Sequence, residues 1–121
     1  MSTKKKIVVL ISYGLDDERA SVAWSIANGG IKSGLDVNIF LVSSGVDWVR
    51  KGTADHVHLN PLDPPMIDMI RKVMDEGRVC VCPPCARVRG FMDTDMLEGV
   101  EVVGSSAIHE LVKEDAATLT F

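Results

Sequence analysis

Lys6-Ile7-Val8-Val9-Leu10-Ile11, near the start of the chain, carries an unbroken apolar run rich in β-branched residues. Such a run is typical of a strand that is buried on both faces, as in a parallel sheet. Ser12-Tyr13-Gly14 ends the run, and Asp16-Asp17-Glu18 then predicts a cap and an acidic first turn for a helix from about Asp17 to Lys32. The opening therefore predicts a strand followed by a helix, which is the repeating unit of parallel α/β proteins.

The same alternation continues to the end of the chain. Further strands are expected at 35–42, 78–82, 99–103 and 117–121, and further helices at 45–51, 65–77 and after Gly104-Ser105-Ser106, with a long surface loop at 52–65. This order predicts a single domain over residues 1–121. Its fold class is a three-layer α/β/α arrangement with a mostly parallel five-stranded sheet, Rossmann-like or flavodoxin-like.

Composition narrows the classes of function. A net charge of −4 makes nucleic acid an unsuitable main partner, and no apolar run approaches the roughly 20 residues of a membrane span. We therefore expect a cytoplasmic protein that engages neither nucleic acid nor membrane. The chain has no G-x-G-x-x-G motif and no P-loop, so no cofactor is predicted. Trp24 and Trp48 mark either ordinary core packing or a subunit interface.

Three short loops follow the first three predicted strands. They are Ser12-Tyr13-Gly14, Ser43-Ser44-Gly45 and Cys82-Pro83-Pro84-Cys85. In open parallel sheets, sites form where the carboxyl ends of the strands meet the loops that follow them. The sequence therefore predicts a functional site at this edge, to which Tyr13 contributes as an auxiliary residue.

All three cysteines lie within one short segment, at Cys80, Cys82 and Cys85. An odd number of cysteines in a cytosolic chain argues against structural disulfides, and their clustering argues for chemistry. Cys80 lies deeper in its strand and is expected to be a small buried hydrophobe. Cys82 ends the strand, where a lowered pKa would make it a thiolate nucleophile, with Arg87 or Arg89 supplying positive potential.

Two other interpretations of the cysteines remain open. Three thiolates with one histidine would complete a tetrahedral metal site that uses Cys80, Cys82 and Cys85, although no second C-x-x-C pair is present. Alternatively, all three thiols are buried and structural, and the chain is a non-catalytic subunit of an assembly. Elemental analysis and thiol titration would separate these interpretations.

The segment Val81-Cys82-Pro83-Pro84-Cys85-Ala86-Arg87-Val88-Arg89-Gly90 places a cysteine eight residues before the glycine of an Arg-Gly pair. In this register, and in the closing pattern Gly99-Val100, Val103-Gly104 and Phe121, the chain resembles the DsrE/DsrF-like family and its TusD-type sulfur-relay subunits. The resemblance extends from Lys6 to Phe121.

The resemblance implies sulfur-carrier chemistry, with a possible classification as a sulfurtransferase. Cys82 would receive sulfane sulfur from a donor protein as a persulfide and pass it to the cysteine of an acceptor protein. Family members commonly assemble as trimers or hexamers of like or related subunits. Cys85 departs from the TusD-like pattern, where this position is apolar. A second thiol there could attack a Cys82 persulfide, release sulfide and leave a disulfide, as in a reductase-like or redox-sensing variant.

Overall fold

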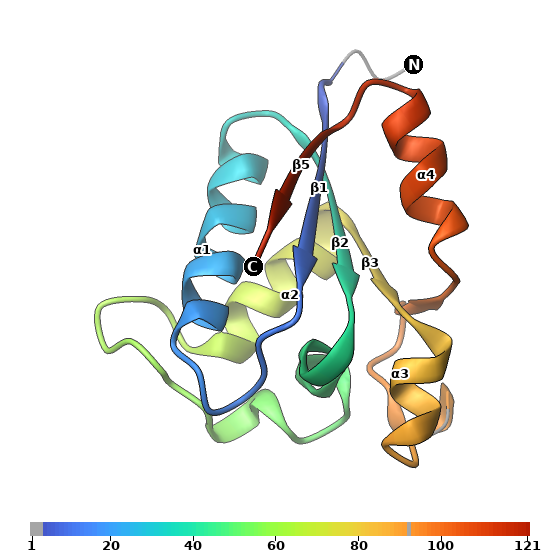
Figure 1. The fold of residues 1–121 in the computed structure, drawn as a ribbon. Coiled ribbons are helices and arrows are strands. Elements are labelled where there is room, and N and C mark those ends of the chain that lie inside the picture. The colour runs from blue at the N-terminus through green and yellow to red at the C-terminus, as the bar shows by residue number, and fades with distance from the viewer. Residues whose placement is uncertain (1–3, 92) are drawn as a thin grey trace.

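The computed structural model describes residues 4–91 and 93–121, which form an α/β fold around one five-stranded sheet (Figure 1). The strand order is β4-β3-β2-β1-β5, and every pairing between neighbours is parallel. The strands are β1 (Lys6–Ile11), β2 (Asp36–Leu41), β3 (Arg78–Val81), β4 (Glu101–Val102) and β5 (Ala117–Thr120). The predicted fold class is therefore confirmed.

Helices cover the two faces of this sheet. They are α1 (Arg19–Lys32), α2 (Met66–Glu76), α3 (Pro83–Val88) and α4 (Ser106–Lys113), with short 3₁₀ helices η1 (Ser43–Val49), η2 (Ala54–His56) and η3 (Asp93–Asp95). The first two helices pack against each other on one face. The last helix crosses from β4 at one edge to β5 at the other, and a right-handed crossover in that direction places α4 on the opposite face (Figure 1). Among the described residues, no helix is both long and apolar enough to cross a membrane.

The main core lies between the sheet and the pair of helices α1 and α2. Alternate strand residues such as Val9, Ile39 and Val81 point into it and are fully buried. The apolar stripe predicted for the second of these helices is also buried, at Met66, Met69, Ile70 and Val73. Both tryptophans belong to this core, so the interface interpretation of Trp24 and Trp48 does not apply.

The second face of the sheet is covered more thinly. Val8, Phe40 and Cys80 are buried there, but α4 has no buried residue and β5 is exposed along its whole length. The helix contributes only half-buried side chains to this layer. The second layer is therefore weaker than the first, and the edge strand β5 lies open.

Three sequence expectations need correction. The first helix begins at Arg19 rather than Asp17, because the Asp17 carboxylate accepts the Arg19 backbone N–H at 2.9 Å and so precedes the first turn. The expected loop at 52–65 contains a 3₁₀ helix and is tied to α1 by the Ser21 hydroxyl, which donates to the Asp63 carboxylate at 2.7 Å. The fourth strand retains only Glu101–Val102, because it pairs on one side with the short β3.

Gly45 lies where the loop after β2 closely approaches the end of β1, so a substitution at this position tests how tightly the two segments pack. A Cβ at this position would overlap the Ile11 carbonyl oxygen, so we expect Gly45→Ala to lower the free energy of unfolding by about 2 kcal/mol. Gly29→Ala is the matched control, since nothing lies within 4 Å of its added carbon. Within α1 this change should stabilise the protein by about 0.5–1 kcal/mol. Urea denaturation measures both, and an equal effect of the two changes would contradict the packing argument.

Candidate functional site

The structure brings the three predicted loops together at the carboxyl edge of the sheet. A Cβ on Gly14 would lie 3.0 Å from Ser44, and Gly45 packs against the end of β1, so the first two loops are in close contact. Ser43 adopts a φ of 51°, a left-handed conformation that is uncommon for a residue with a side chain. Backbone strain of this kind often accompanies functional loops. The third loop, which carries the thiols, joins them through Arg89.

The thiol segment leaves the sheet in a defined way. The Cys82 N–H donates to the Leu41 carbonyl at 3.0 Å and prolongs the β2–β3 ladder by one residue. Cys82 is then the N-cap of α3, with extended backbone, and Pro83 and Pro84 fill the first turn. Proline suits this position because the first helical N–H groups have no partner within the helix. The helix therefore begins at Pro83.

The three thiols differ in exposure. Cys80 is buried beneath the second face of the sheet, whereas Cys82 and Cys85 are half-buried, and all three are free. Burial raises the pKa of Cys80, which keeps it a neutral thiol. This placement agrees with the expectation of a small buried hydrophobe at Cys80 and leaves a pair of accessible thiols, Cys82 and Cys85, one helical turn apart.

The expected lowering of the Cys82 pKa is wrong for this chain. Burial raises the pKa of Cys82, and the neighbouring Cys85 thiol raises it further through a side-chain hydrogen bond and charge repulsion. The Cys85 backbone amide acts in the opposite direction and lowers the Cys82 pKa, although no full side-chain capping bond closes the helix. With prolines at 83 and 84, this amide is the first N–H that α3 presents to the sulfur.

Arg87 and Arg89 do not supply the positive potential at Cys82 that the sequence predicts. Arg89 donates through Nη1 to the Cys85 carbonyl at 3.1 Å and through Nη2 to the Ser44 hydroxyl at 3.4 Å. It thus ties α3 to the loop after β2. Arg87 is exposed and lines a cavity of about 340 Å³ together with Pro83 and Phe91. Neither guanidinium is among the causes of the Cys82 pKa shift.

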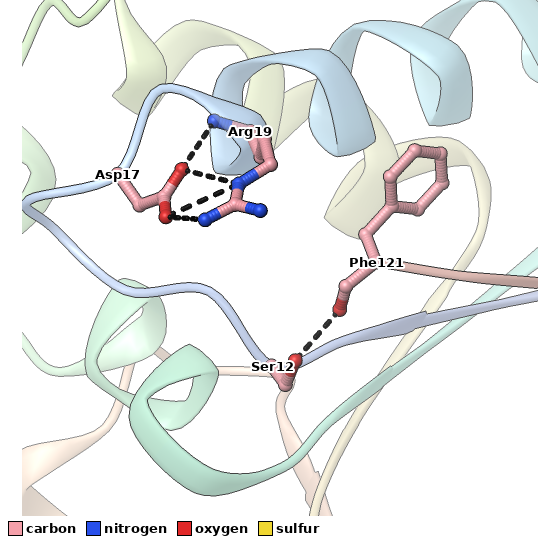
Figure 2. A network of polar contacts seen from close by, with 4 residues as sticks. All are labelled: Ser12, Asp17, Arg19 and Phe121. Atoms are coloured by element: carbon pink, nitrogen blue, oxygen red, sulfur yellow. Dashed lines mark hydrogen bonds and ion pairs between the residues drawn. The ribbon is translucent and has the colours of Figure 1, made fainter.

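Tyr13 lies in the first loop and is held from two sides. The Arg19 guanidinium stacks over its ring, 4.1 Å from the centroid, and the Trp48 indole N–H donates to its carbonyl at 2.8 Å. Arg19 is itself paired with Asp17 (Figure 2), and this pairing lowers the Asp17 pKa to about 2. These contacts make Tyr13 part of the scaffold of the first loop.

The terminal residue also joins the first loop. The Ser12 hydroxyl and the Ser12 backbone N–H both donate to the Phe121 carbonyl oxygen, at 2.8 and 2.7 Å (Figure 2). No local pattern signals this contact or the Arg89–Ser44 bridge, because each joins residues that are far apart in the chain. In both cases only the parallel pairing of the strands brings the partners together.

A metal site was the second interpretation of the cysteines. Within residues 4–91 and 93–121, no three His, Cys, Asp or Glu side chains are gathered closely enough to hold a metal ion. His58 lies in the loop before α2 and donates a hydrogen bond through Nε2 to the Asp63 carbonyl oxygen, 2.7 Å away. The described residues therefore do not bring Cys80, Cys82 and Cys85 together as a set of metal ligands.

The fold and the site together define an α/β protein with a C-x-x-C thiol pair at the carboxyl edge of a parallel sheet. The sequence model of the DsrE/DsrF-like family matches residues 5–121. The chain therefore belongs to the DsrE/DsrF-like family, which is associated with sulfur relay in general.

Individual relatives support this membership. The chain is 29% identical over 119 residues to the uncharacterized protein MJ0989 of Methanocaldococcus jannaschii, covering 97% of this chain and 99% of the relative. It is 32% identical over 120 residues to the uncharacterized protein MK0008 of Methanopyrus kandleri, covering 95% and 93% of the two chains. The crystal structure of the YchN protein from E. coli shares the fold, with a TM-score of 0.77 at 20% identity over 98% of this chain and 100% of that one.

The raised Cys82 pKa gives a testable pH dependence. Only the thiolate reacts with iodoacetamide, so the alkylation rate of Cys82 should keep rising as the pH passes the ordinary thiol pKa. Cys85→Ala removes the thiol that raises the Cys82 pKa, and should move the curve to lower pH. Cys80→Ala is the control and should leave the curve in place. Peptide mapping gives the rate at Cys82, and a plateau below the ordinary thiol pKa would contradict this assignment.

Proposed function

We propose that the protein is a sulfur carrier that holds sulfane sulfur as a persulfide on Cys82 and passes it to a partner protein. The observation that carries the proposal is the half-buried thiol pair at the N-terminal turn of α3, on the edge where three loops meet. Family membership supports the same chemistry, because the family is associated with sulfur relay in general. A reducing compartment such as the cytoplasm suits this role, since it keeps thiols free.

The loading step balances without an outside oxidant. The Cys82 thiolate attacks the terminal sulfur of a donor persulfide, a new S–S bond forms on Cys82, and the donor S–S bond breaks. The electron pair leaves with the donor thiolate, which takes up a proton. Unloading is the same exchange in reverse, with an acceptor cysteine as the attacking group.

Because the Cys82 pKa is raised, the reactivity of Cys82 depends on the groups that a bound donor or acceptor protein places near its sulfur. Burial raises the Cys82 pKa and so lowers the fraction of Cys82 present as thiolate, the reactive form, in the isolated chain. A cationic group on a bound partner would favour the thiolate. The outer side of α3 offers such a partner an accessible surface, because Pro84, Arg87 and Val88 are exposed around the thiol pair.

The carrier role is tested in a Cys85→Ser chain, in which a second thiol cannot react with the product. After brief exposure to inorganic polysulfide and alkylation, mass spectrometry should find one added sulfur atom on Cys82. Adding Cys82→Ser should reduce the gain at least ~10-fold, because the nucleophile is lost. Adding Cys80→Ser instead is the control and should leave the gain unchanged, since Cys80 is buried. An equal gain without Cys82 would refute the proposal.

We also propose that copies of this chain assemble into an oligomer through α1 and β5. Val22 and Ile26 on the helix are 45% and 39% exposed, and Leu119 on the open edge strand is 38% exposed. Leu119 pairs with Val9 and so lies on the sheet face that the helix covers. Val22 and Ile26 lie one helical turn apart, and exposed apolar side chains that lie together mark contact surfaces more often than scattered ones do.

The assembly proposal is tested by placing a charge on this surface. Ile26→Asp should convert the oligomer to a smaller species in sedimentation velocity experiments, because burying an unpaired carboxylate opposes association. Leu62→Asp is the matched control, since Leu62 is 93% exposed in a separate loop and should tolerate the charge. A parent protein that sediments as a monomer would refute the proposal.

A further inference from the structure

We propose that the thiol pair also reduces the sulfur that it carries: Cys85 attacks the Cys82 persulfide, releases the terminal sulfur as hydrogen sulfide and leaves a Cys82–Cys85 disulfide. This inference rests on the proposed loading of Cys82 and adds a second fate for the bound sulfur. The loaded sulfur passes to a partner when one is docked, and is released as sulfide when none is.

The position of the two cysteines on α3 supports this step. Cys82 is the N-cap and Cys85 is the third residue of the helix, so the two lie on neighbouring positions of one turn. The side chains of an N-cap residue and of the third helical residue lie beside each other at the start of a helix, so the Cys85 thiol lies near the Cys82 sulfur. A nucleophile held close to its target has a large effective concentration, and intramolecular attack is then fast compared with attack from solution.

The backbone between the two thiols is rigid. Pro83 and Pro84 have φ fixed by their rings, and no other residue separates the cysteines. Ala86, the next residue, is buried, and its N–H donates to the Cys82 carbonyl at 3.2 Å. This bond closes the turn that contains both thiols, so the pair is held together before any sulfur is bound.

Arg89 holds this turn against the sheet edge. Its guanidinium reaches back to the Cys85 carbonyl at 3.1 Å and across to Ser44 at 3.4 Å. The contact acts on the residue that must attack, and it fixes that residue relative to the loop after β2. Arg89 therefore links Cys85 to this loop, whereas Arg87 is exposed and lines a cavity with Pro83 and Phe91.

The reaction balances within the site. The Cys85 thiolate attacks the inner sulfur of the Cys82 persulfide, and the S–S bond between the inner and terminal sulfurs breaks. The electron pair leaves with the terminal sulfur as hydrosulfide, which takes up the proton released by Cys85. The two thiol sulfurs supply two electrons and the sulfane sulfur accepts them, so no external oxidant is needed. A dithiol such as dithiothreitol then reduces the disulfide and resets the site.

Cys80 cannot replace Cys85 in this step. Only 3% of its surface is exposed, and it lies within β3 beneath the second face of the sheet. Attack on Cys82 from there would require β3 to leave its pairing with β2 and β4. Cys80 thus provides the matched control among the three cysteines of the chain.

The experiment follows the loaded protein after the donor is removed. The full chain, Cys85→Ser and Cys80→Ser are loaded with inorganic polysulfide and desalted, and intact mass and free sulfide are followed with time. The parent and Cys80→Ser should lose the added sulfur, release one sulfide per loaded chain and end two hydrogen atoms lighter than the reduced protein. In Cys85→Ser the persulfide should last at least ~10-fold longer, since attack must come from another molecule. Cys85→Ala provides a second removal of the thiol if serine perturbs the turn.

The outcomes separate this inference from the carrier role. Sulfide release at the same rate in the parent and in both Cys85 variants would overturn the inference, as would a parent persulfide that stays intact. In either case loading of Cys82 would still stand. Absence of added sulfur on Cys82 in every Cys85 variant, with no disulfide formed in the parent, would overturn both proposals.

Discussion

The hydrogen bond from the Cys82 N–H to the Leu41 carbonyl is the constraint on which the site depends. It keeps the chain in the parallel ladder until the last possible residue, after which Pro83 has no N–H with which to continue it. The chain must therefore turn into α3 at this point. Because β1, β2 and β3 run in the same direction, the loops that follow them lie at the same edge of the sheet as this turn. The packing of Gly45 and Ser44 then provides the surface against which Arg89 fixes the helix.

The local pattern of the sequence was sufficient to predict the layers of the fold. The apolar run at Lys6–Ile11 and the stripe through Met66, Met69, Ile70 and Val73 have periods that only a buried strand and an amphipathic helix satisfy. The alternation of strands with helices then determined the parallel sheet. The ends of the helices and strands were less predictable. The start of α1, for example, depends on which backbone N–H donates a hydrogen bond to the Asp17 carboxylate. The length of β4 likewise depends on its neighbour in the sheet, not on its own residues.

The site was predictable in its place but not in its electrostatics. The order of the strands placed Cys82 at the carboxyl edge, whereas its pKa depends on how much surrounding protein removes water from the sulfur. Nearby arginines in the sequence suggested a lowered pKa, yet Arg89 is committed to the Cys85 carbonyl and the Ser44 hydroxyl. Sequence distance within one helical turn says little about which way a long side chain reaches.

Trp48 links the core to the loops that surround the thiols. Its ring is fully buried, and its indole N–H donates to the Tyr13 carbonyl at 2.8 Å. Trp24 is equally buried in the core on α1, but among the described residues its indole N–H has no partner. The two tryptophans of the chain therefore differ in hydrogen bonding as well as in place. Fluorescence from the first carries information on the loop edge where sulfur would bind, while fluorescence from the second reports the integrity of the helix–sheet core.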